Sequence, residues 1–144
     1  MTSPSNDARL SAGERILDHW RLVVFVVATT AFTVSAVREF TAPGGPTPGS
    51  DAAFFQHAGW YMTQGAIPYV DFWDVKPPVT HFTSAGLALI SFGDMYVLHV
   101  LAVLLTASAG VAVVALVAML THRLTDDRVA SVAAAFTVLC LAGF

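Results

Sequence analysis

Charged residues are absent from four stretches of the chain, at residues 22–37, 77–93, 95–122 and 129–144. A helix needs about 20 mostly apolar residues to cross a roughly 30 Å hydrocarbon core. Residues 95–120 are therefore predicted to form a transmembrane helix. Residues 20–38 form another if Trp20 and Arg21 lie at the membrane interface, where both side chains are tolerated. Residues 129–144 predict a third, truncated transmembrane helix.

The stretch at residues 77–93 allows two interpretations. Pro77 and Pro78 open it, as proline can at a first helical turn, and Gly93 closes it. At about 1.5 Å per residue, residues 79–92 reach roughly 21 Å, which is too short to cross. The length thus favours an interfacial helix near residues 78–92, while a crossing helix stays the alternative.

Arginine positions suggest an orientation in the cell membrane, since cytoplasmic segments carry an excess of Lys and Arg. Arg9, Arg15 and Arg21 precede the first predicted span, so we expect a multi-pass protein whose leader, residues 1–19, is cytoplasmic. The loop at residues 121–128 is also arginine-bearing. It is cytoplasmic if residues 78–92 lie flat and external if they cross, so charge also favours the flat orientation.

The loop between the first two spans, residues 39–94, is external in this topology. It opens with the Pro/Gly-rich stretch at 41–50 and then predicts a second interfacial helix near residues 52–64. Ser50 or Asp51 can cap that helix and Gly65 can end it. Its apolar face comprises Phe54, Phe55, Ala58, Tyr61 and Met62, with Gln56, His57 and Gln64 mostly elsewhere. The expected fold is an all-α integral membrane protein with three transmembrane and two interfacial helices.

Composition supports this fold class and excludes several functions. Of the 144 residues, 56% are hydrophobic and 12% charged, whereas soluble domains usually carry about a quarter charged residues. The formal net charge of −3 offers no basic surface for a nucleic-acid partner. The single cysteine, Cys140, excludes an internal disulfide and a cysteine-based zinc or iron–sulfur site.

Four charged residues of the external loop carry the candidate chemistry: Asp51, Asp71, Asp74 and Lys76. A carboxylate can take a proton from a hydroxyl acceptor, and a lysine can neutralise a phosphate. Structural interpretations compete, because Asp51 can be a helix cap, Asp71 and Asp74 turn residues, and Lys76 an interfacial anchor.

Aromatic and histidine side chains add weaker signals. An interfacial belt or a sugar-binding platform fits the loop's aromatic residues Trp60, Tyr61, Tyr69, Phe72 and Trp73. No metal-ligand spacing joins His57, His81, His99 and His122, which we interpret as interfacial or packing residues.

Residues 50–93 resemble the first external loop of polytopic C-type glycosyltransferases. The pattern is similar to the dolichyl-phosphate-mannose protein mannosyltransferase and aminoarabinose transferase type, glycosyltransferase family 39-like. The matching elements are an acid after the first span, an aromatic helix, a G-x-x-P-Y-x-D turn, a K-P-P triplet and a final F-G. Here they are Asp51, residues 54–64, Gly65 to Asp71, Lys76-Pro77-Pro78 and Phe92-Gly93.

The resemblance implies a role for each matched position. Asp51 stands at the catalytic acid that activates the acceptor, and Lys76 at the contact to the lipid-linked phosphate. With Lys76, we expect Tyr69, Asp71 and Asp74 to bind substrate. The family implies a polyprenyl-phosphate-linked sugar as donor, membrane lipid around the site, and inverting transfer on the outer face. Many members have a second acid where this chain has Ala52, and some have a glutamate where it has Val75. A divalent metal as cofactor stays possible but is not supported by these residues.

Family enzymes have more spans than this chain, which leads to two hypotheses. The chain is the N-terminal portion of a membrane glycosyltransferase, inactive alone or completed by a second chain that supplies the missing spans. The alternative is a small non-catalytic three-span membrane protein, an assembly or transport subunit. In that case Asp51 and Lys76 could both become alanine without loss of function.

Cysteine labelling tests the predicted topology. In a Cys140→Ser background, a cysteine at position 51 should react with a membrane-impermeant maleimide in intact cells. A cysteine replacing Arg123 should react only after permeabilisation, because residues 78–92 lie flat and leave the two positions on opposite sides. Reaction of both positions in intact cells would instead show that residues 78–92 cross.

Overall fold

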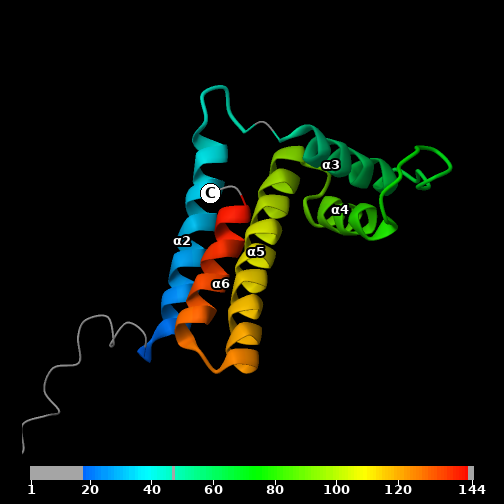
Figure 1. Ribbon diagram of the computed structural model, residues 1–144. Helices are drawn as coiled ribbons and strands as arrows, with labels where there is room; N and C mark the ends of the chain where they lie inside the picture. Colours follow the sequence, from blue (N-terminus) through cyan, green and yellow to red (C-terminus); the bar gives the residue numbers. More distant parts are fainter. Residues whose placement is uncertain (1–17, 47, 143–144) are drawn as a thin grey trace, which may run out of the picture. The chain divides into compact units, whose positions relative to one another are not determined.

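The computed structural model describes residues 18–46 and 48–142, in which all regular elements are helices (Figure 1). In chain order these are α2 (Trp20–Thr41), α3 (Ser50–Thr63), α4 (Pro78–Ile90), α5 (Met95–Thr125) and α6 (Arg128–Leu141). The predicted all-α class is confirmed. Residues 1–17 of the expected leader, including Arg9 and Arg15, and residues 143–144 of the third expected span lie outside the described residues.

Two helices in the described part of the chain are long and apolar enough to cross a membrane. α2 has 22 residues and a hydropathy of 1.8, and α5 has 31 residues and a hydropathy of 2.6. α6 is a shorter apolar helix of 14 residues, less than the roughly 20 that a crossing needs. Two of the three predicted spans therefore meet the requirement, and the third stays a prediction.

The connection between α5 and α6 is shorter than the sequence suggested. We expected a loop over residues 121–128, but α5 continues to Thr125 and only Asp126 and Asp127 separate the helices. No glycine or proline interrupts residues 121–125, so nothing ends the helix earlier. Asp126 then takes a left-handed backbone, with φ of 51°, and the Asp127 carboxylate caps the first N–H groups of α6.

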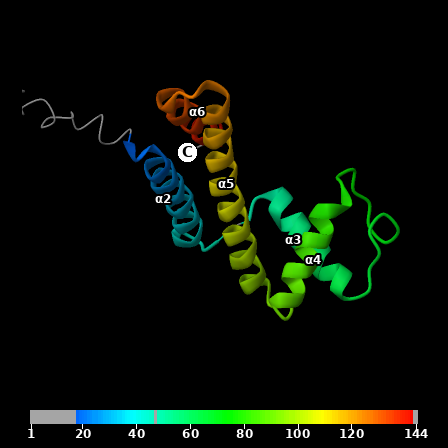
Figure 2. The ribbon, with the colours of Figure 1, turned by 90° about the horizontal axis from the view of Figure 1, so that it is seen from below.

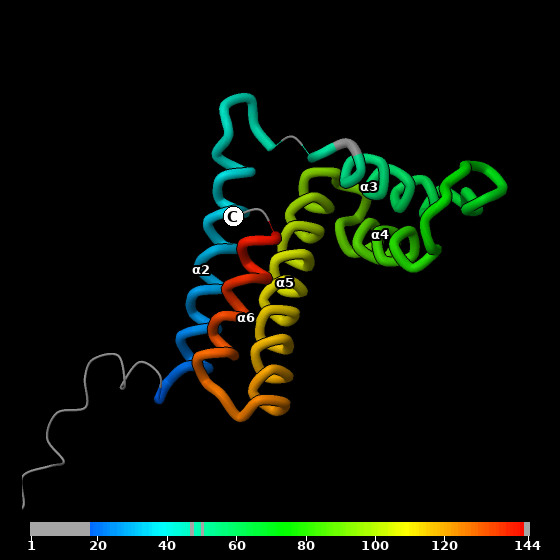
Figure 3. Tube along the Cα trace, in the orientation of Figure 1, coloured from blue at the N-terminus to red at the C-terminus, as the bar shows by residue number. Residues whose placement is uncertain are grey.

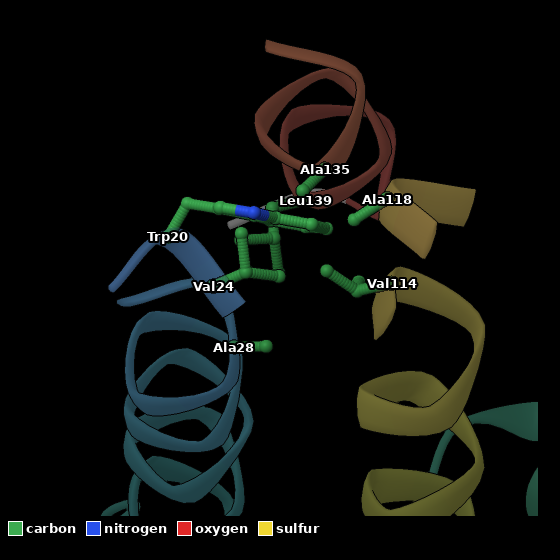
Figure 4. Close-up of a cluster of buried hydrophobic side chains, with 7 residues drawn as sticks. All are labelled: Trp20, Val24, Ala28, Val114, Ala118, Ala135 and Leu139. Atoms are coloured by element: carbon green, nitrogen blue, oxygen red, sulfur yellow. The ribbon is translucent and has the colours of Figure 1, made fainter. Parts of the chain in front are cut away.

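The chain divides into two compact units. The first comprises Met1–Ser35 and Ser108–Phe144. Its core is a cluster of side chains that point toward one another from α2, α5 and α6 (Figure 4). On each helix the cluster members are four residues apart, which places them on one face. They are Trp20, Val24 and Ala28; Val114 and Ala118; and Ala135 and Leu139.

The second unit, Ala36–Ala107, contains α3 and α4, which lie side by side in both ribbon views (Figures 1 and 2). Gly59 of α3 meets the backbone of Ser84 in α4. A β-carbon built on Gly59 would lie 2.4 Å from the Ser84 carbonyl carbon, closer than any real contact permits. Ala58 and Ala88 are also buried. Small residues thus allow the two helices to touch backbone to backbone.

The ends of α3 and α4 follow the predicted signals with one exception. Pro77 and Pro78 begin α4, and Gly65 and Gly93 take the left-handed backbone just beyond α3 and α4. The loop between them turns away from both helices before α4 begins (Figure 3). The N-cap of α3 is Gly49 with no side-chain cap, so the capping role considered for Asp51 was wrong.

The contact at Gly59 predicts an asymmetric response to alanine. Gly59→Ala should lower the free energy of unfolding by about 1–3 kcal/mol, because the added methyl forces two backbones apart. Gly86→Ala is the matched control on α4, since a β-carbon there meets nothing within 4 Å. That change should raise stability by up to about 1 kcal/mol. Denaturation of both variants in detergent micelles, followed by circular dichroism, measures the difference; equal effects would contradict the packing.

Candidate functional site

The structure brings Asp51 and Lys76 into direct contact. The Lys76 Nζ donates to Asp51 Oδ2 at 2.6 Å, although 25 positions separate the two residues in the sequence. Asp51 lies in the first turn of α3, and Lys76 directly precedes Pro77, the N-cap of α4. The packing of α3 on α4 therefore joins the two residues that we predicted to act together.

This ion pair is open to solvent. The Asp51 side chain is 80% exposed and the Lys76 side chain 42% exposed. An exposed pair of this kind contributes at most about 1 kcal/mol, so separating the two groups costs little. Lys76 Nζ also lies 4.6 Å from the centre of the Phe55 ring, a cation–π contact that persists without the carboxylate. The ammonium group can thus exchange Asp51 for another anion while the ring still supports it.

The main chain of Lys76 is held from both sides. Its N–H donates to Asp74 Oδ1 at 3.2 Å, and its carbonyl accepts from the Tyr69 hydroxyl at 2.6 Å. Tyr69 itself takes a left-handed backbone with φ of 66°, which an ordinary side chain adopts only where its surroundings hold it. Its N–H donates to the Phe72 carbonyl, so the turn is closed internally.

The five predicted site residues thus fall into three groups. Asp51 and Lys76 form the pair, while Tyr69 and Asp74 hold the backbone of Lys76. The Asp71 carboxylate instead accepts from the Ile67 N–H at 2.7 Å, which matches the turn role that we also considered. What each residue does for a substrate stays a prediction.

A histidine that we interpreted as a packing residue belongs to this site. His81 in α4 is completely buried, and its Nε2 lies 3.1 Å from Asp74 Oδ2. Four rings surround its imidazole at centroid distances of 5.4 to 6.3 Å: Phe54, Phe55, Tyr69 and Phe72. The sequence held one usable signal, because His81, Ser84 and Ala88 are spaced as one helical face and form the buried stripe of α4.

Gln56, which we placed mostly away from the apolar face of α3, is also part of the packed interior. It is buried, with 6% exposure, and its Nε2 lies 3.0 Å from Nδ1 of His99 in α5. The other ring nitrogen of His99 lies 2.9 Å from Glu39 Oε1 near the end of α2. Apolar periodicity cannot reveal such a residue, because its burial depends on a partner 43 positions away.

A cavity of about 320 Å³ lies next to the ion pair. Phe55 lines this cavity, and its ring also contacts the Lys76 ammonium. Ala52, Val79 and Thr80 also line it, so the neighbours of Asp51 and Lys76 form part of its wall. Within the described residues, no group of three His, Cys, Asp or Glu side chains is placed to hold a metal ion.

A family model described as DolP-mannose mannosyltransferase matches residues 65–144, which is more than half of the chain. The chain belongs to this family. The match includes Tyr69, Asp74, Lys76 and His81 but begins beyond Asp51. The resemblance drawn from the external loop is thereby confirmed for the mannosyltransferase type.

A curated relative extends the similarity toward the N-terminus. The dolichol phosphate-mannose mannosyltransferase of Haloferax volcanii is 36% identical over 105 residues, which cover 73% of this chain and 23% of the relative. The chain therefore spans about a quarter of that protein's length. No solved structure matches the chain.

Proposed function

We propose that this chain forms the donor-binding part of a membrane mannosyltransferase that uses dolichol phosphate-mannose. Family membership supports the reaction class, and the contact between Asp51 and Lys76 carries the assignment of the site. A proton acceptor and a phosphate-binding cation lie within reach of one lipid headgroup, and transfer from a lipid-linked sugar uses both kinds of group. The rest of a longer polypeptide, or a second chain, supplies the acceptor site and further spans.

The reaction needs two groups that act on opposite sides of the mannose C1, one on the incoming acceptor hydroxyl and one on the leaving phosphate. As an acceptor hydroxyl oxygen bonds to the mannose C1, the Asp51 carboxylate takes the hydroxyl proton. The bond between C1 and the phosphate oxygen breaks, and its electron pair stays with dolichyl phosphate. The Lys76 ammonium stabilises the negative charge gained by this leaving group. Attack opposite the leaving group inverts the configuration at C1.

The exposed ion pair suits this sequence of events. A donor phosphate is an anion that forms charge-assisted hydrogen bonds with an ammonium group, so it can compete with the Asp51 carboxylate for Lys76 Nζ. When the ammonium turns to the phosphate, Asp51 loses its partner and is free to accept a proton. We place this site at the external face, with the N-terminus cytoplasmic and the cavity beside Phe55 receiving the apolar part of the lipid adjoining the phosphate.

Replacing Asp51 tests the proposed proton acceptor. In membranes of the host cell that makes the chain, Asp51→Asn should lower mannose transfer from dolichol phosphate-mannose by about 100-fold or more, because an amide cannot accept the proton. Asp94→Asn is the matched control: Asp94 Oδ1 accepts from the N–H groups of Tyr96 and Val97, and an asparagine oxygen can do the same. Unchanged transfer by Asp51→Asn, with normal insertion, would favour the non-catalytic alternative.

Chemical labelling tests the proposed phosphate contact without any turnover. Lys76 is the only lysine in the 144 residues, so an acylating reagent modifies one side-chain amine. Dolichyl phosphate should protect Lys76 from the reagent in detergent micelles, because the phosphate covers the ammonium. Dolichol, which has no phosphate, is the control. Equal labelling with the two lipids, read from the Lys76 peptide by mass spectrometry, would exclude this phosphate contact.

A further inference from the structure

His81 has no role in the reaction as proposed, yet it is the most enclosed polar side chain near the site. Its exposure is 0%, and its imidazole is surrounded by the edges and faces of four aromatic rings. An apolar side chain would fill such a space at lower cost, since burying a polar ring without full hydrogen bonding is unfavourable. The imidazole is therefore expected to do something that a phenyl ring cannot.

The group that the imidazole faces is Asp74. Their closest atoms, Nε2 and Oδ2, are 3.1 Å apart, although the N–H does not point straight at the oxygen. The Asp74 side chain is only 11% exposed, so water can satisfy little of its charge. A carboxylate only accepts hydrogen bonds, so a ring N–H at Nε2 is its natural partner. Within the described residues, Oδ2 of Asp74 accepts no hydrogen bond, and the ion-pairing group near it is His81 Nε2.

The other oxygen of Asp74 transmits this orientation to Lys76. Oδ1 accepts a hydrogen bond from the Lys76 N–H. If the Asp74 carboxylate rotated, this hydrogen bond would break or the Lys76 N–H would have to move with it. Pro77 follows directly and restricts the Lys76 backbone to extended conformations. Tyr69, whose ring lies 6.0 Å from the His81 ring, holds the Lys76 carbonyl. His81 is thus linked to the N–H of Lys76 through Asp74 and to the carbonyl of Lys76 through Tyr69.

We infer that His81 is a positioning residue that, through Asp74, holds the Lys76 ammonium beside Asp51 and the donor phosphate. The part that concerns the phosphate rests on the proposed function. The part that concerns Lys76 and Asp51 rests on the geometry alone. His81 touches no reacting atom in this arrangement and acts only through the residues that it orients.

Variants of His81 separate its N–H from its bulk. His81→Phe keeps an aromatic ring in the cage and removes the donor. In His81→Gln the amide nitrogen falls near the place of Nε2, whereas the shorter side chain of His81→Asn places it near Nδ1, out of reach of Asp74. The Gln and Asn variants therefore form a matched polar pair that stays informative even if His81→Phe fails to fold. His57→Phe changes an exposed histidine of α3 and is the control.

The acylation rate of Lys76 reports on the ion pair itself. In the full 144-residue chain in micelles, His81→Phe and His81→Asn should raise this rate by up to about fivefold, which is what loss of an exposed ion pair permits. His81→Gln and His57→Phe should leave it near the wild-type value. Equal rates for the Asn and Gln variants, or an unchanged rate in His81→Phe, would overturn the positioning role.

The concentration of dolichyl phosphate that gives half-maximal protection separates the two claims. It should rise by up to about fivefold in His81→Asn and not in His81→Gln. If the acylation rates follow the prediction but dolichyl phosphate protects no variant, the positioning role stands and the proposed function fails. If dolichyl phosphate protects all variants equally and the acylation rates are also equal, the proposed function stands and the role of His81 is wrong.

Discussion

The site depends on the backbone contact between α3 and α4 at Gly59 and Ser84. Asp51 stands at the start of one helix, while His81 belongs to the other and Lys76 directly precedes it. A side chain at Gly59 would push the helix axes apart, since its β-carbon would overlap the Ser84 carbonyl carbon. Isolated helices of 14 and 13 residues are only marginally stable in water, so each is stabilised chiefly by this packing. The contact between Asp51 and Lys76 therefore depends on a glycine at position 59.

Much of the architecture followed from local signals. Proline at the start of α4 and glycine after α3 and α4 fix those helix ends through backbone geometry, which the residue itself determines. The apolar stretches at residues 22–37 and 95–122 predicted α2 and α5, because the length of an apolar run is also a local property of the sequence. The end of α5 was misjudged because Arg123 and its neighbours were taken to mark a loop, whereas charged residues continue a helix without penalty.

The site was only partly predictable because its contacts join residues far apart in sequence. Composition and motif brought attention to Asp51 and Lys76, but neither specifies a 2.6 Å contact across 25 positions. The contact of the Asp74 carboxylate with the Lys76 N–H agrees with the predicted turn role, while its position facing His81 was not predicted and its substrate role stays a prediction. His81 itself was set aside because a single histidine in an apolar segment is ordinarily a packing residue. Only the aromatic enclosure and the adjacent carboxylate, both tertiary features, distinguish it.

The two halves of the site differ in how firmly they are held, and the difference suits their proposed roles. Asp51 and Lys76 are exposed, so their mutual attraction is weak and a competing anion can replace it. His81 is buried and the Asp74 side chain is nearly so, and an unpaired charge in such a place is costly, so each group constrains the other. In the proposed mechanism, Asp74 and His81 keep the main chain of Lys76 fixed while its ammonium group changes partners. Gln56 extends this support, because its contact with His99 joins the helix of Asp51 to the beginning of α5.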